Sequence, residues 1–165
     1  LSAAAARGLS SVAVPGASDI AVIGAVGLSA LAAERHAAPL FGALRPQLDA
    51  DGWTFAPLVV ATCGRVAIAD HVAVALRARM SVILIGERPG LSVVDSLGLY
   101  VTWDPRPGRS DAERNCMSNV HGGGLGYDSA AARLYQLVTA ARAARRTGTE
   151  LGHWDGPATR FLARG

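Results

Sequence analysis

Residues 80–85 read Met80-Ser81-Val82-Ile83-Leu84-Ile85, and the chain continues with Gly86-Glu87-Arg88-Pro89-Gly90. A short run this rich in apolar side chains is typical of a strand that is buried on both faces of a sheet. Glycine and proline then predict a loop, which carries one carboxylate and one guanidinium group. Because open α/β sheets bind their ligands beyond the carboxyl ends of the strands, this loop is the first candidate for a binding site.

Three other segments have the composition of strands. Residues 19–24 and 55–61 are apolar runs, and the second is rich in β-branched residues at its centre. Residues 99–103 form a shorter run, which is bounded by glycine on one side and by Asp-Pro on the other. The sequence therefore predicts four strands.

Apolar residues at helical spacing predict helices over residues 28–50, 66–76 and 128–146, the last with Asp128 as its N-cap. Pro39 fits the first turn of a helix better than a helix interior, so residues 28–50 are predicted to form two helices. Strands that alternate with helices favour an α/β fold. We expect an open, mostly parallel, doubly wound (Rossmann-like) sheet with helices on both of its faces.

The chain divides into three parts by composition. Residues 1–18 are rich in small side chains and only weakly periodic, so we expect them to be loosely ordered. Residues 19–147 contain all the predicted strands and helices and form one Rossmann-like domain. Residues 148–165 are rich in glycine and predict an irregular C-terminal tail. Because the chain begins with Leu1 rather than methionine, we also expect that a further segment precedes it.

Composition argues against several classes of function. The chain has 165 residues, of which 50% are hydrophobic and 18% are charged, as is usual for a folded globular domain. The net charge is +3 and all 16 basic residues are arginines, but they are spread along the chain, and aromatic residues make up only 5%, so a nucleic-acid-binding surface is not expected.

A membrane-spanning helix, a signal peptide and disulfides are not expected either. No apolar run reaches the roughly 18 residues that a membrane-spanning helix needs, and the first residues lack the basic segment of a signal peptide. The two cysteines, Cys63 and Cys116, form no Cys-x-x-Cys pattern, which argues against a zinc site and favours a reducing compartment.

Glycine-containing loops follow three of the predicted strands, at residues 24–29, 62–66 and 86–90. A glycine directly after a strand allows the backbone to approach a ligand closely, although a glycine at such a place more often only forms an ordinary turn. Neither the Gly-x-Gly-x-x-Gly pattern of dinucleotide-binding folds nor a P-loop is present. From the residues alone, the prediction is a small-molecule-binding α/β domain whose ligand is not identified.

The charged and sulfur-containing residues also have plain structural interpretations. Glu87 and Arg88 taken alone favour a surface ion pair or solvated charges, and Cys116 taken alone favours a small buried residue. Ser110 followed by Asp111 and Glu113 predicts a helix N-terminus.

Three blocks in a fixed order identify a family resemblance. They are Gly86-Glu87-Arg88-Pro89-Gly90-Leu91-Ser92, Asp95-Ser96-Leu97-Gly98, and Asp111-Ala112-Glu113-Arg114-Asn115-Cys116-Met117-Ser118-Asn119. An earlier piece, Gly64-Arg65-Val66-Ala67 with Asp70, belongs to the same pattern. Over residues 19–146 the chain resembles the small (light) subunit of ethanolamine ammonia-lyase.

This resemblance implies a subunit that packs on a larger, TIM-barrel subunit and holds adenosylcobalamin between the two. The reaction would convert ethanolamine to acetaldehyde and ammonia, with the radical chemistry and the substrate site on the large subunit. Residues 19–147 would form the cobalamin-binding domain, and the positions that match the family's cobalamin contacts are Val66, Glu87 and Cys116. The resemblance implies no catalytic residue and no metal ligand on this chain. It also implies base-on cobalamin. This fits the absence of the Asp-x-His-x-x-Gly pattern of base-off binders, because Asp70 and His71 are adjacent.

The chain departs from the family pattern at three places. The family has a helical segment before the first strand, which is largely absent here. It has Asp where this chain has Val26, and its C-terminus differs from the sequence that follows Gly148. Two alternatives therefore remain: a stand-alone α/β binding domain, or a truncated copy of the subunit without function. The expected location is the cytoplasm, with a bacterial microcompartment as a more specific possibility.

Overall fold

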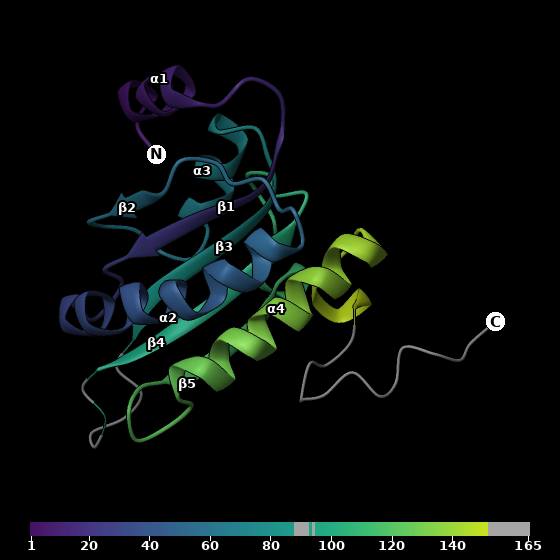
Figure 1. Cartoon of the computed structure of the whole chain (residues 1–165). Coiled ribbons are helices and arrows are strands. Elements are labelled where there is room, and N and C mark those ends of the chain that lie inside the picture. Colours follow the sequence, from purple (N-terminus) through teal and green to yellow (C-terminus); the bar gives the residue numbers. More distant parts are fainter. Residues whose placement is uncertain (88–92, 94, 152–165) are drawn as a thin grey trace.

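The computed structural model describes residues 1–87, 93 and 95–151, and within these residues five strands form one open sheet (Figure 1). The strands are β1 (Ser18–Ala25), β2 (Val59–Ala61), β3 (Ala78–Glu87), β4 (Ser96–Trp103) and β5 (Asn115–Val120). The helices are α1 (Ala3–Val12), α2 (Ala30–Ala50), α3 (Ile68–Ala75) and α4 (Tyr127–Ala144), with short 3₁₀ turns η1 (Asp111–Glu113) and η2 (Gly148–Glu150).

The sheet is mixed rather than mostly parallel. Its order is β2-β1-β3-β4-β5; β1 pairs in parallel with β2 and β3, whereas β4 is antiparallel to both β3 and β5. The prediction of a mostly parallel, Rossmann-like sheet is therefore not confirmed. The reason is the length of the connections: a parallel crossover needs a dozen or more residues and usually a helix. Only residues 88–95 join β3 to β4, so the chain must turn back beside β3.

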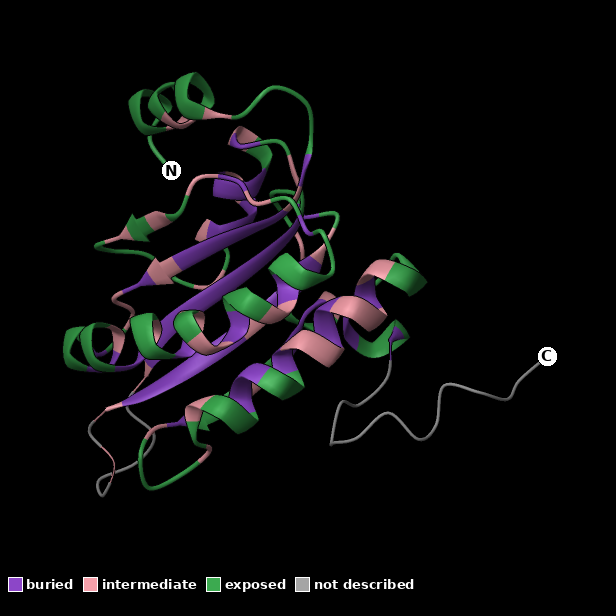
Figure 2. Ribbon diagram, in the orientation of Figure 1, coloured by how far each residue is buried: buried purple, intermediate pink, exposed green. Residues whose placement is uncertain are grey.

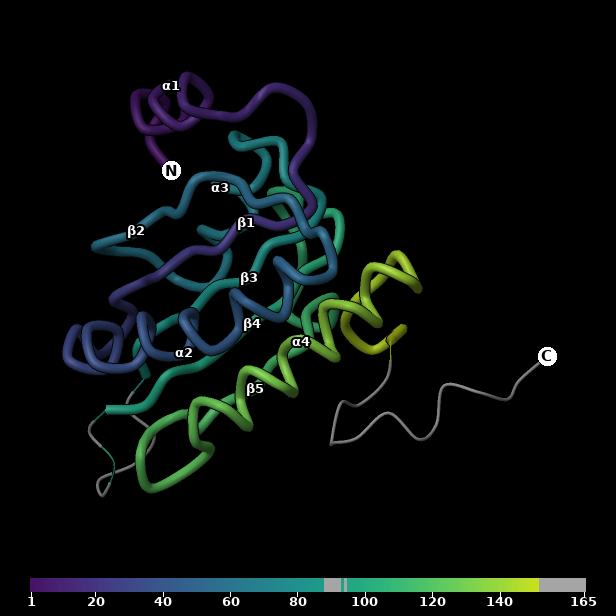
Figure 3. The backbone as a smooth tube through the Cα atoms, viewed as in Figure 1, coloured from purple at the N-terminus to yellow at the C-terminus, as the bar shows by residue number. Residues whose placement is uncertain are grey.

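Helices cover both faces of the sheet, as expected (Figures 1 and 3). Helices α2 and α4 pack on one face, and α3 packs on the other with α1 outside it. We call the second side the α3 face. Successive strand residues point to opposite faces, and because helices cover both faces, most residues of the central strands are buried (Figure 2). The fully enclosed part of the core on the α3 face consists of Ala21, Ile23, Ala25, Ala56, Ala69, Val72, Ala73, Leu76, Ile83 and Ile85.

Helix α2 is one continuous helix that contains both Pro39 and Pro46, not the two helices predicted from Pro39. A proline inside a helix costs about 3 kcal/mol because it removes one backbone hydrogen bond. Leu40, Leu44 and Leu48 follow at four-residue spacing and are completely buried on the sheet and α4. Burial of each leucine contributes about 1.5–3 kcal/mol, so continuing the helix through the proline is the more favourable arrangement.

Two other segments differ from the prediction. Residues 55–61 form a strand only at Val59–Ala61, at the sheet edge, where Val60 is 73% exposed. Residues 1–18, expected to be loosely ordered, contain helix α1, which Ser2 caps and whose Leu9 packs on the core of the α3 face. The predicted tail 148–165 begins with η2, and its part from residue 152 lies outside the described residues.

Two strand-exit glycines bring protein backbone, rather than a ligand, into close approach. The N–H of Leu28 donates to the carbonyl of Gly86 at 2.8 Å. A Cβ atom on Gly86 would lie 2.0 Å from the carbonyl oxygen of Ser29, and one on Gly27, where φ is +58°, would lie 2.4 Å from the Gly86 oxygen. The loop after β1 is thus packed directly on the end of β3, so these two glycines serve the fold.

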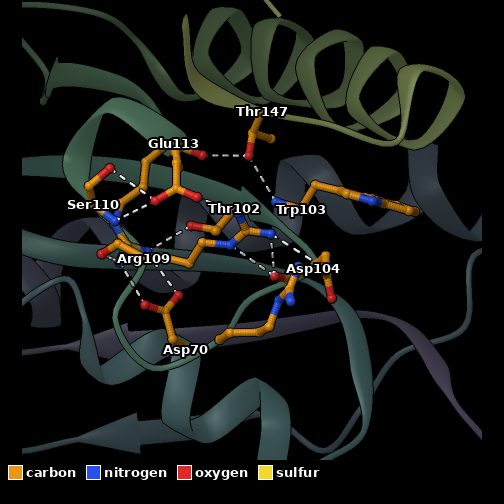
Figure 4. A network of polar contacts seen from close by, with 10 residues as sticks. Asp70, Thr102, Trp103, Asp104, Arg109, Ser110, Glu113 and Thr147 are labelled. Atoms are coloured by element: carbon orange, nitrogen blue, oxygen red, sulfur yellow. Dashed lines mark hydrogen bonds and ion pairs between the residues drawn. The ribbon is translucent and has the colours of Figure 1, made fainter. Parts of the chain in front are cut away.

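A buried ion pair joins α3 to β4 and β5 (Figure 4). Both terminal nitrogens of Arg114 donate to Asp70 of α3, at 2.8 and 2.6 Å, and one of them also donates to Thr102 of β4 at 2.9 Å. The side chains of Arg114 and Asp70 are 2% and 1% exposed. The hydrogen bonds to Asp70 raise the pKa of Arg114 above its ordinary value. Arg114 lies directly before β5, so the pair fixes the start of this strand.

The pair is surrounded by a second layer of polar contacts. Ser110 and Glu113 form a reciprocal capping box at η1, and Arg109 forms an ion pair with Glu113. The Thr147 hydroxyl donates to the carbonyl of Glu113 at 2.7 Å and accepts from the N–H of Trp103 at 3.0 Å (Figure 4). These contacts attach η1 and the segment after α4 to β4. The helix predicted to begin at Ser110 is one short 3₁₀ turn, because β5 already begins at Asn115.

We predict that Asp70→Ala lowers the free energy of unfolding by about 3–5 kcal/mol, because it leaves the buried Arg114 charge without a partner. Asp49→Ala is the matched control: Asp49 pairs with Arg45 on the exposed side of α2, so its loss should change stability by no more than about 0.5 kcal/mol. Urea unfolding monitored by circular dichroism measures both values. Equal, small losses in the two variants would contradict a structural role for the buried pair.

Candidate functional site

Glu87 lies at the end of β3 and points to the α3 face. Strand β3 pairs with β4 so that Ile85 is opposite Gly98 and Ile83 is opposite Tyr100. The side chain of Glu87 reaches across to β4, where its Oε1 accepts a hydrogen bond of 2.9 Å from the Tyr100 hydroxyl. Glu87 is half-buried, so its carboxylate is held against the sheet and is not a freely solvated surface charge.

Cys116 lies on β5, a strand that the sequence did not predict, and is opposite Tyr100 in the β4–β5 ladder. Directly opposed residues point to the same face, so Glu87, Tyr100 and Cys116 share the α3 face. Cys116 is exposed, and so is Ser118, the next residue of β5 with the same orientation. The interpretation of Cys116 as a small buried residue is therefore wrong for this chain.

Val66 lies in the connection between β2 and α3, half-buried and packed on the core of the α3 face. The carboxyl ends of β2, β1 and β3 are level, since Ala25 is paired with both Ala61 and Ile85. Val66 is therefore on the α3 face, as Glu87 is, and it is at the same end of the parallel strands.

Tyr100 is a residue of this site that the sequence did not reveal. It is half-buried and lies between Glu87 on β3 and Cys116 on β5. Burial raises the pKa of Tyr100, and the hydrogen bond to Glu87 raises this pKa further. The phenol therefore stays protonated and remains a hydrogen-bond donor. Its pairing depends on strand register, which no local pattern in the sequence indicates.

The polar residues of β4 on this face form one row. Gly98, Tyr100 and Thr102 alternate with the buried Leu97, Leu99 and Val101, which face α2 and α4. Thr102 contacts the Arg114–Asp70 pair and Tyr100 contacts Glu87. The structural ion pair and the candidate site are therefore neighbours on the same strand.

A groove lies on the opposite face of the sheet. An apolar groove of about 540 Å³ runs between α2 and the strands β1 and β2, and its lining includes Val22, Phe41, Val60 and Leu84. Val26, which replaces an aspartate expected from the resemblance, also lines this groove. Neither Glu87 nor Cys116 contributes to it.

The remaining predictions concern segments and groups away from these strands. Residues 88–92 of the first candidate loop lie outside the described residues. In the described part of the chain, no cluster of three or more His, Cys, Asp or Glu side chains is arranged to hold a metal ion. Across residues 1–87, 93 and 95–151, no helix has the length and apolar character needed to cross a membrane.

Comparison with known proteins gives one consistent result. The family model of the ethanolamine ammonia-lyase light chain (EutC) matches residues 1–152. An ethanolamine ammonia-lyase small subunit from Pseudomonas paraeruginosa is 55% identical over 125 residues, and so is one from Azotobacter vinelandii. One from Ralstonia nicotianae is 56% identical over 123 residues.

The alignments cover 76%, 76% and 74% of this chain but only 46%, 46% and 45% of those three relatives. The chain thus spans about half the length of the curated relatives it matches. The family model covers nearly the whole chain, and it includes the strands that carry Glu87, Tyr100 and Cys116. The chain therefore belongs to the ethanolamine ammonia-lyase light-chain family.

Proposed function

We propose that this chain is the cofactor-binding part of an ethanolamine ammonia-lyase small subunit. It would hold adenosylcobalamin on the α3 face, against a larger catalytic subunit that converts ethanolamine to acetaldehyde and ammonia. The observation that carries the proposal is the placement of Val66, Glu87 and Cys116, which come from three separate parts of the chain, on one face of the sheet.

The origin of these residues supports a ligand with several separate contacts. Val66 precedes α3, Glu87 ends β3 and Cys116 lies on β5, so a ligand that touches all three spans several elements of the fold. A corrin ring with its peripheral amides and its nucleotide tail has the extent to do this.

The chemistry of the face also fits the cofactor. The amide side chains of a corrin are hydrogen-bond donors, and the Glu87 carboxylate is an acceptor. Val66 supplies an apolar contact, and Cys116 a small, weakly polar one. Asp70, which is next to His71, already binds Arg114 with both carboxylate oxygens, so it is not available to support His71 as a cobalt ligand. This is consistent with base-on binding.

Adenosylcobalamin, when bound, supplies the radical that starts the rearrangement. The residues of this chain would bind and orient the cofactor and exclude water from its edge. Val66 would pack on it, Glu87 would accept hydrogen bonds from its amides, and Cys116 would limit its position by shape. No residue of this chain is assigned a proton-transfer or nucleophilic role, and the substrate site is assigned to the large subunit.

The alternative, which belongs to a different class of function, is a stand-alone binding domain. Its support would be the apolar groove between α2 and β2, which is independent of the α3 face. In the main proposal the cytoplasm is the location, and a microcompartment is a more specific possibility. Nucleic acid and membrane are not proposed as partners.

Reconstitution with the large subunit distinguishes the two functions. We expect ammonia release from ethanolamine only when this chain, the large subunit and adenosylcobalamin are all present. Acetaldehyde is measured with alcohol dehydrogenase and NADH, and complex formation by size-exclusion chromatography. Failure of the two chains to co-elute, together with ligand binding by this chain alone, would favour the stand-alone domain.

Glu87→Ala should weaken cobalamin binding to the complex by about 1–3 kcal/mol, the cost of leaving buried hydrogen-bond partners unsatisfied. Glu34→Ala is the control, because Glu34 is an exposed carboxylate on α2, beside the groove of the opposite face. Spectroscopic titration with cyanocobalamin measures the dissociation constants. An unchanged value for Glu87→Ala would remove Glu87 from the cofactor site.

Cys116→Ser should retain nearly full turnover, because a hydroxyl is close in size to a thiol and no chemical step is assigned to the sulfur. In a Cys63→Ser background, where Cys116 is the remaining cysteine, alkylation with N-ethylmaleimide should block cobalamin binding through overpacking. Bound cobalamin should in turn slow the alkylation. Loss of turnover in Cys116→Ser with cobalamin still bound would show that the sulfur has a chemical role.

A further inference from the structure

We propose that Gly98 and Tyr100 are positioning residues that hold the Glu87 carboxylate in its binding orientation. This inference rests on the proposed function, because it assigns a role to two β4 residues beside Glu87. It concerns orientation rather than direct contact with the cofactor: Tyr100 supplies the hydrogen bond, and Gly98 supplies the space.

Gly98 leaves space for the Glu87 carboxylate. Gly98 is opposite Ile85, two residues before Glu87, so the Glu87 side chain must lean back along the sheet to pass over it. A Cβ atom on Gly98 would lie 2.3 Å from Oε1, 2.4 Å from Cδ and 2.8 Å from Oε2 of Glu87. Real Cβ atoms do not approach other atoms this closely. Any side chain at position 98 would therefore displace the carboxylate from this position.

Tyr100 forms a hydrogen bond with the Glu87 carboxylate, which lies over Gly98. The hydroxyl donates to Oε1 at 2.9 Å, and the ring packs on the core of the α3 face. A ring anchored in the core has few alternative rotamers, so the hydrogen bond restrains Glu87 more strongly than a solvent-exposed donor would. Cys116 is on the far side of Tyr100, and the carboxylate is thereby directed along the face toward β5.

The expected benefit is preorganisation. Glu87 is the last residue of β3, where a glutamate without a partner would populate several rotamers. A ligand that binds only one of these rotamers would bind more weakly, because the free protein would also populate the other rotamers. Fixing the carboxylate before the cofactor arrives avoids this loss, so Tyr100 should influence cobalamin affinity only through Glu87.

A double-mutant cycle tests this dependence in the complex with the large subunit. The cyanocobalamin dissociation constant is measured for the unmodified complex, Tyr100→Phe, Glu87→Ala and the double variant. Tyr100→Phe keeps the ring and removes the hydroxyl, and we expect it to raise the constant about tenfold. In the Glu87→Ala background the same change should have less than a twofold effect.

Two further variants complete the experiment. Gly98→Ala should raise the dissociation constant by a similar factor, again only while Glu87 is present. Tyr135→Phe is the matched control, since it removes an equivalent tyrosine–carboxylate hydrogen bond, to Asp51, on the side of α2 and α4. It should leave the constant unchanged. Thermal unfolding of each variant identifies any loss of fold, and Gly98→Ala tests the inference independently if Tyr100→Phe is unstable.

The outcomes separate this inference from the proposed function. Equal effects of Tyr100→Phe with and without Glu87 would overturn the positioning role and leave the cofactor site intact. If Glu87→Ala alone leaves the dissociation constant unchanged, the assignment of Glu87 to the cofactor site fails first, and the positioning role fails with it.

Discussion

The buried pair of Asp70 and Arg114 determines how the parts of the candidate site are placed. It connects α3, which begins just after Val66, to β5, in which Cys116 lies two residues after Arg114. Thr102 adds β4 to the same network, on the face where Tyr100 contacts Glu87. A buried ion pair adds little net stability compared with well-packed apolar residues, but removing one partner is costly. Its value in this fold is geometric: it fixes an edge strand and a short helix relative to the central strands.

The central part of the fold could be predicted from sequence because it depends on continuous apolar runs. Strands β1 and β3 and the helices on either side of them have strong local signals, and they were predicted within a few residues. The direction of β4 and the existence of β5 were not predicted. Strand β5 contains Asn115, Cys116, Ser118 and Asn119, and its pairing with β4 is stabilised by neighbours distant in sequence. Pro39 is the opposite case. It is a strong local signal for a helix boundary, but the burial of the leucines of α2 outweighs it.

The candidate site was predictable only in part, and for a related reason. Glu87 was noticeable because it ends the strongest strand, whereas the family resemblance was needed to select Val66 and Cys116. Tyr100 and Gly98 could not be found in this way. Their relation to Glu87 depends on the β3–β4 register, which places residues 13 positions apart in hydrogen-bond contact. Glycine at position 98 looked like a strand boundary, yet it lies inside β4, where the absence of a side chain leaves room for a carboxylate.

The most direct test of this account is a cryo-electron microscopy map of the complex of this chain with the large subunit and adenosylcobalamin. We expect corrin density on the α3 face, with a peripheral amide within hydrogen-bond distance of Glu87 and the ring edge against Val66 and Cys116. Corrin density in the groove between α2 and β2, or on the large subunit away from β3 and β5, would contradict it.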